Sequence, residues 1–179
     1  MTSGTSELAR PIKVRAVPER FSLDTSEAER AGLARRFSVT AIPALSGTLS
    51  LQQTEEGIAV HGTLEGEIVQ PCAVTREDFA YAFREPVALI FVPEGQLTQY
   101  DESEEIELDP AAPDELEYEG DSFDLGEALA QTLGLAIDPY REGPNADAAR
   151  NEAGIESDEE FDAAPKGPLA EALAGLRKG

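Results

Sequence analysis

The stretch that decides the fold is LSGTLSLQQTEEGIAVHGTLEGEIVQ, residues 45–70. From Ile58 to Ile68 the large apolar residues fall on even positions, while polar residues occupy the odd positions from His61 onward. This alternation is typical of an antiparallel strand with one buried face and one wet face. Residues 55–57 read as a turn, so the stretch predicts two antiparallel strands joined in a hairpin.

Strand signals continue on both sides of this hairpin. Residues 10–18 predict a short strand, and alternating aromatic and aliphatic residues over 79–91 predict a longer one. Pro86 should mark a bulge or an edge in that strand, because proline cannot donate to a ladder. Gly62 and Gly66 fall on the apolar parity of the hairpin, which predicts a bend or the close approach of another element.

Three segments carry helix signals. Ser26 and Glu29 have the spacing of a capping box and predict a helix start. In DLGEALAQTLGLAIDPY, residues 124–140, Asp124 is the expected N-cap, and Asp138 followed by Pro139 ends the helix. PLAEALAGLRK predicts a short amphipathic helix at the end of the chain.

These elements predict an α+β fold, an antiparallel sheet with packed helices, a long acidic excursion and a tethered C-terminal helix. The expected organisation is a single α+β domain over residues 1–141 that includes the acidic excursion 94–119. A flexible acidic linker over 142–165 and a C-terminal amphipathic helix over 166–179 follow it. Docking of that helix on a partner and docking on the protein's own core are equally compatible with its pattern.

Charge is distributed unevenly along the chain, whose formal net charge is -22. Residues 1–36 carry seven Lys/Arg against five acids, whereas residues 37–179 carry 31 acids against seven bases. Thirteen acids fall between Glu94 and Asp124, and no Lys or Arg lies between Arg84 and Arg141. Such an acidic body repels a phosphate backbone, because affinity for nucleic acid comes mostly from Lys/Arg contacts.

This polarity predicts two kinds of surface. The candidate RNA-facing residues all lie in the basic N-terminal segment: Arg10, Lys13, Arg15, Arg30, Arg35 and Arg36. The candidate residues facing a basic partner lie in the acidic excursion: Asp101, Glu102, Glu104, Glu105 and Glu107. Complementary charge speeds the encounter with a basic protein, although acidity that serves solubility alone accounts for the same composition.

Cys72 is the only cysteine in the chain, so an enzyme with a cysteine nucleophile would have to use it. A nucleophilic thiolate needs a base, and His61, the only histidine, is eleven residues away, so the two would face opposite sides of an unbroken strand. The acidic run lacks the alternating ligands and central glycine of an EF-hand loop. We therefore expect no catalytic residue, no metal site, no cofactor, no small-molecule substrate and no enzymatic activity.

The N-terminal residues contain no apolar targeting segment, and no run approaches the roughly 18 apolar residues of a membrane helix. A single cysteine also forms no internal disulfide. A cytoplasmic protein that does not enter a membrane is the expectation.

Four features in this order carry a resemblance: RPIKV followed by a helix, GTLEGEIVQPCAVT, DLGEALAQTLGLAIDPY and a terminal PLAEALAGLRKG. Together they resemble the YceD-like large-subunit ribosomal RNA accumulation proteins, in the form typical of alphaproteobacteria. The resemblance implies a non-enzymatic bacterial factor that supports accumulation of the 23S ribosomal RNA, hence a role in ribosome biogenesis. It also implies a partner, either a precursor of the large subunit or a basic ribosomal protein of the zinc-ribbon type.

Many members of that family carry Cys-x-x-Cys where this chain has Cys72 and Thr75. With no second cysteine, the metal-binding idea attached to that motif does not carry over to one chain. We expect Cys72 to hold a structural place at the strand exit, with Thr75 or Thr63 bonding the turn. A different class of function remains open: an acidic interaction module unrelated to ribosomes that docks through its C-terminal helix.

Overall fold

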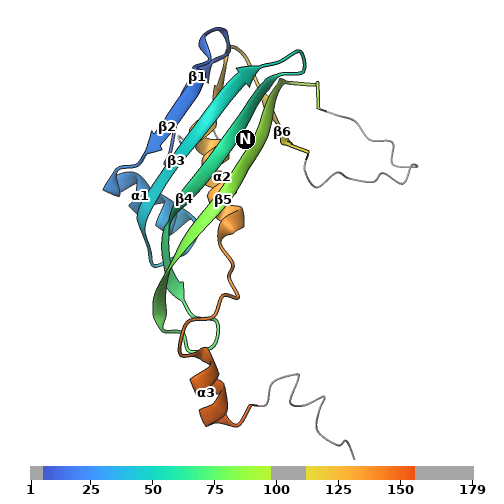
Figure 1. Ribbon diagram of the computed structural model, residues 1–179. Coiled ribbons are helices and arrows are strands. Elements are labelled where there is room, and N and C mark those ends of the chain that lie inside the picture. The colour runs from blue at the N-terminus through green and yellow to red at the C-terminus, as the bar shows by residue number, and fades with distance from the viewer. Residues whose placement is uncertain (1–5, 98–111, 156–179) are drawn as a thin grey trace, which may run out of the picture. The chain divides into compact units, whose positions relative to one another are not determined.

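A computed structural model describes residues 6–97 and 112–155 (Figure 1). The chain divides into two compact units. The first combines the chain through Pro71 with Asp78–Pro139, and the second combines Cys72–Glu77 with the chain from Tyr140 onward. This division differs from the predicted single domain over 1–141, because the turn that follows the central hairpin strand groups with residues after Pro139 rather than with the sheet.

The first unit is built on a five-stranded sheet with the order β2-β3-β4-β5-β6. Its strands are β2 (Arg20–Asp24), β3 (Ala41–Gln53), β4 (Ile58–Pro71), β5 (Asp78–Pro93) and β6 (Asp114–Tyr118). β3 and β4 are the predicted hairpin, and their turn is closed by the Thr54 N–H donating to the Gly57 carbonyl at 2.8 Å. The α+β class is therefore confirmed.

One strand pair departs from the expected antiparallel arrangement. β5 and β6 run parallel, with Leu89 opposite Asp114 and Pro93 opposite Tyr118. β6 contains Leu116 and Tyr118, and residues 98–111, which precede it, lie outside the described chain. Pro86 lies on β5 before the part that β6 pairs, so it occupies an edge, as predicted.

The hairpin glycines mark a close approach of two backbones. A Cβ at Gly62 would lie 2.1 Å from the Thr48 carbonyl oxygen, and one at Gly66 would lie 2.3 Å from the Ala44 carbonyl oxygen. Both oxygens belong to β3, the neighbouring strand. The prediction that these glycines admit another element is confirmed, and no larger residue fits without moving β3.

The N-terminal segment is more broken than the sequence predicts. The strand expected over 10–18 is limited to β1 (Pro11–Lys13), which pairs antiparallel with β7 (Ser122–Asp124) in a separate two-stranded sheet. A short 3-10 helix, η1 (Val14–Ala16), then turns the chain, and the Val14 N–H donates to the Asp121 carbonyl at 3.0 Å. β2 follows and was not predicted, although Phe21 and Leu23 alternate with polar residues.

Two helices cover one face of the five-stranded sheet (Figure 1). α1 (Glu27–Arg36) begins with the predicted capping box of Ser26 and Glu29. α2 (Leu125–Ala136) begins at the predicted cap, where the Glu127 N–H donates to the Asp124 side chain at 3.2 Å. None of the helices in the described part of the chain is long and apolar enough to cross a membrane.

A hydrophobic core lies between these helices and the sheet. Leu33 from α1, Leu129 and Leu133 from α2, and Leu64 and Ile68 from β4 are fully buried in it. Leu64 and Ile68 are even positions of the hairpin, which the sequence pattern assigned to the buried face. Burying each such side chain contributes about 1.5–3 kcal/mol, so the core fixes the helices on the sheet.

The second unit contains α3 (Ala146–Ala153), within the residues predicted as a flexible linker. The prediction relied on the scarcity of apolar residues, but alanine and arginine are strong helix formers. Gly154 ends the helix in the left-handed region at φ 68°, and Arg150 pairs with Glu142 and Asp147. The rest of the predicted linker, from 156 onward, and the predicted C-terminal helix over 166–179 lie outside the described residues.

Candidate binding surfaces

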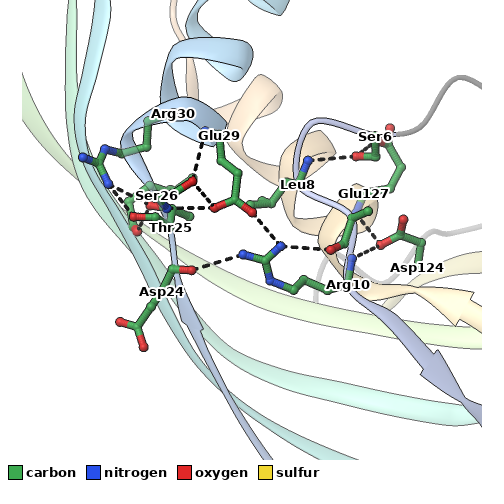
Figure 2. A network of polar contacts seen from close by, with 12 residues as sticks. Ser6, Leu8, Arg10, Asp24, Thr25, Ser26, Glu29, Arg30, Asp124 and Glu127 are labelled. Atoms are coloured by element: carbon green, nitrogen blue, oxygen red, sulfur yellow. Dashed lines mark hydrogen bonds and ion pairs between the residues drawn. The ribbon is translucent and has the colours of Figure 1, made fainter.

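The predicted RNA-facing residues fall into two groups, and Arg10 represents the group that is engaged within the fold. Its guanidinium pairs with Glu29 at 2.7 Å and donates to the Asp24 carbonyl at 3.2 Å. Its backbone N–H donates to Asp124 at 2.8 Å (Figure 2). Arg10 thus joins the cap of α1 to the cap of α2, and the hydrogen bonds from Arg10 and from the Ser26 N–H lower the pKa of Glu29 to about 2.

Arg36 forms the second internal ion pair of this kind. Its two terminal nitrogens donate to the two carboxylate oxygens of Glu127 at 2.8 and 2.6 Å, and Glu7 lies 3.4 Å away. Glu127 also accepts a hydrogen bond from the Ser6 hydroxyl at 2.6 Å. The bidentate pair with Arg36 lowers the pKa of Glu127 to about 2 and raises the pKa of Arg36.

The remaining basic candidates are placed at the surface. Lys13 lies 3.8 Å from Asp121, and both side chains are about 74% exposed. Arg15 on η1 and Arg35 on α1 are exposed. Arg30 donates to the Thr25 carbonyl and hydroxyl, which holds its guanidinium beside the start of α1 (Figure 2).

The structure brings Arg30 and Arg35 together along a groove between α1 and the start of β3. The groove has a volume of about 500 Å³, and Ala34, Val39 and Ile42 form part of its apolar floor. Two of the predicted RNA-facing side chains thus share this surface. Arg10 and Arg36 form ion pairs within the fold.

The predicted residues for a basic partner, Asp101, Glu102, Glu104, Glu105 and Glu107, lie outside the described residues. The described acids that follow them are placed on β6 and the turn after it. Glu117 and Glu119 are exposed there, and the Gly95 N–H donates to Glu117 at 2.8 Å.

A second hollow opens between β6 and α2, and we name it the β6–α2 cavity. Its volume is about 290 Å³, and its lining includes the rings of Phe91, Tyr118 and Phe123. Sequence reasoning missed this cavity. The signal that could have found it is the aromatic residues set among acids in ELEYEGDSFD, residues 115–124.

In the second unit Cys72 begins a tight turn. Its N–H donates to the Glu77 carbonyl at 2.8 Å, and its carbonyl accepts from the Arg76 N–H at 3.0 Å. Arg76 adopts a left-handed φ of 64°, which is uncommon for a residue with a side chain. Thr75 bonds the turn as predicted, because its hydroxyl accepts from the Glu77 N–H at 3.2 Å.

Cys72 is 1% exposed, and its sulfur accepts several hydrogen bonds. The N–H groups of Val74 and Thr75 donate to it at 3.4 Å, and the Gly143 N–H donates at 3.2 Å. The Thr75 side chain and these backbone groups lower the pKa of the thiol to about 7, because each favours the thiolate. The turn is thus shaped around the sulfur atom.

These surroundings bear on the catalytic and metal-binding alternatives for the thiol. The Cys72 sulfur is surrounded by N–H donors and Thr75, whereas His61 is exposed on β4 opposite Ser50 and Ala88. Among the described residues, no group of three or more His, Cys, Asp or Glu side chains is arranged to hold a metal ion.

Comparison with known proteins gives a match to a protein family. No curated protein and no solved structure matches the chain. The family model described as large ribosomal RNA subunit accumulation protein YceD matches residues 60–177, which include most of β4, all of β5, the β6–α2 cavity and the Cys72 turn. Because the match covers more than half of the chain, this protein belongs to the YceD family of large ribosomal RNA subunit accumulation proteins.

Proposed function

We propose that this protein is a non-enzymatic ribosome-biogenesis factor that acts by binding in the cytoplasm of a bacterium. Membership of the YceD family carries the proposal, because it assigns the chain to accumulation of the large-subunit ribosomal RNA. The binding partner is a basic large-subunit ribosomal protein or a precursor of the large subunit. The protein either shields the basic ribosomal protein until assembly or binds to the precursor particle.

The charge of the chain favours a basic protein as the direct contact. Residues 37–179 carry 31 acids against seven bases, so their surface attracts a cationic partner and repels exposed phosphates. A basic ribosomal protein without its RNA needs such a partner, since its Lys/Arg surface otherwise binds nucleic acid non-specifically. A zinc-ribbon protein of the large subunit has this character.

Any contact with RNA that accompanies this binding is made by the α1 side of the first unit. Arg30 and Arg35 flank the groove between α1 and β3, and Arg15 is exposed on η1. Arg10 and Arg36 support this surface from within, because Arg10 joins the N-terminal segment to α1 through Glu29 and Arg36 joins α1 to α2 through Glu127. Two or three phosphate contacts give weak, strongly salt-dependent binding, which suits a secondary contact on a particle.

Capture of ribosomal proteins from a bacterial extract tests the proposal. We expect the purified protein to retain basic large-subunit proteins, and Glu102→Lys with Glu104→Lys in one variant to reduce that retention several-fold. The matched control carries Glu55→Lys and Glu56→Lys in the turn between β3 and β4, with the same change of net charge. Equal retention by the two variants would count against the acidic excursion as the binding surface.

A further inference from the structure

The β6–α2 cavity combines aromatic walls with a negative lining. The centroids of the Phe91 and Phe123 rings are 4.2 Å apart, and those of Tyr118 and Phe123 are 6.2 Å apart. Phe91 and Phe123 are about 3% exposed, whereas Tyr118 on β6 remains partly exposed. The Tyr118 ring is therefore accessible to a ligand, and the buried rings of Phe91 and Phe123 support it from the core.

The charged side chains that line the cavity are all acids. Glu117, Glu119, Asp124 and Glu127 contribute carboxylates, and no Lys or Arg is among the described residues of the lining. Arg36 neutralises Glu127, and one oxygen of Asp124 accepts two backbone N–H groups. The remaining charge still makes the cavity negative, and its partly enclosed apolar walls strengthen that field.

The size of the cavity limits what it can hold. Its volume of about 290 Å³ is at the lower end of the roughly 300–1,000 Å³ of small-molecule sites. A single long side chain fits this space better than a nucleotide or a cofactor. The acidic lining favours a cation over a neutral or anionic group.

We propose that the β6–α2 cavity receives an arginine side chain of a basic partner protein, stacked on Tyr118 and paired with Glu119. Arginine suits the site better than lysine, because its planar guanidinium is weakly hydrated, stacks on aromatic rings and bonds a carboxylate at the same time. The aliphatic stem of arginine covers the apolar wall. The inference deepens the proposed function and rests on it for the existence of a basic partner.

Binding of a small probe tests the cavity without any ribosomal component. We would titrate N-acetyl-arginine amide into the isotope-labelled full-length protein and follow backbone amide NMR shifts. Saturating shifts should appear at Tyr118, Phe123 and Ala128, with a dissociation constant on the order of 1–10 mM for one anchored side chain. N-acetyl-citrulline amide, which has a similar shape without charge, should bind at least several-fold more weakly.

Two variants and one control locate the binding. Glu119→Lys should abolish the saturating shifts, and Tyr118→Leu should weaken binding several-fold. Glu55→Lys, with the same change of charge on the turn between β3 and β4, should bind the probe as the natural protein does. Equal binding of citrulline, undiminished binding by Glu119→Lys, or shifts confined to other surfaces would overturn the inference.

Failure of this inference and failure of the proposed function give different results. If the arginine probe does not bind at the cavity while the natural protein still captures basic ribosomal proteins, the cavity assignment is wrong and the proposed function stands. If the probe binds at the cavity but no ribosomal protein is captured, the site is present and its assigned partner is wrong.

Discussion

Replacing Gly126 with alanine should detach the N-terminal segment from α2. A Cβ at this position would lie 1.6 Å from the Leu8 carbonyl oxygen and 2.9 Å from the Arg10 nitrogen, whereas ordinary contacts are 3.4–4 Å. Both contacting atoms are backbone atoms, so no side-chain rotation relieves the overlap. Residues 8–10 must therefore move by roughly 2 Å, which is far more than close-packed interiors tolerate.

The expected cost follows from what that movement removes. Leu8 is fully buried, and exposing it costs about 1.5–3 kcal/mol. The hydrogen bond from the Arg10 N–H to Asp124 contributes about 1 kcal/mol more. Alanine in place of a helical glycine returns about 1 kcal/mol through helix propensity. The net loss in the free energy of unfolding should therefore be about 1.5–3 kcal/mol.

Urea unfolding followed by circular dichroism measures this loss, and Gly134→Ala in the same helix is the matched control. A Cβ at Gly134 would meet only the edge of the Phe37 ring, at 2.7 Å, and that ring can shift. The gain in helix propensity should then nearly offset the contact. If Gly126→Ala is no less stable than Gly134→Ala, the close packing of residues 8–10 on α2 is refuted.

Three further predictions concern individual side chains. Because the folded-state pKa of Glu127 is lowered to about 2, its pair with Arg36 stabilises the fold above pH 4.5 and is lost as the pH falls toward 2. The gap in unfolding free energy between the natural protein and Glu127→Gln should thus be about 1–2 kcal/mol at pH 7, allowing for solvent screening, and should close in acid; a pH-independent gap would exclude the linkage. Thr75→Val should raise the pKa of the Cys72 thiol above about 7, seen in the ultraviolet absorbance of the thiolate during a pH titration, and an unchanged pKa would mean that the backbone N–H groups suffice. Leu129→Ala should lower the free energy of unfolding by about 2–5 kcal/mol in urea, since Leu129 is fully buried between α2 and the sheet; a loss below about 1 kcal/mol would contradict its place in the core.

The elements that the sequence predicted are those with local signals. The β3–β4 hairpin follows from alternating residues around a short turn, and α1 and α2 start at side-chain caps that lie within three residues of their partners. Gly62 and Gly66 were informative because a glycine on the buried parity of a strand leaves room for a neighbouring backbone. Each of these features depends on neighbours in the sequence.

The features that were missed depend on distant partners. The parallel direction of β6 and the grouping of Cys72–Glu77 with residues after Pro139 are set by long-range contacts. Charge counts also did not reveal that Arg10 pairs with Glu29 and Arg36 with Glu127. Composition tells which charges exist, and only the fold tells which charges meet.

The proposed division of the acidic chain into a binding surface and a supporting fold has a physical basis. Glu29 and Glu127 each pair with an arginine within the first unit, have lowered pKa values and are already compensated. Glu119 beside the β6–α2 cavity is exposed and lies in the part of the chain without Lys or Arg, from 85 to 140. Acids of the second kind are the ones that a basic partner can neutralise.

The central claim is tested most directly by depleting this protein from its bacterium. The measurements are the ratio of large- to small-subunit ribosomal RNA and a gradient profile of the ribosomal particles. We expect a selective fall in the large-subunit RNA and in mature large subunits, restored by the natural gene. An unchanged ratio under complete depletion would contradict a role in large-subunit biogenesis.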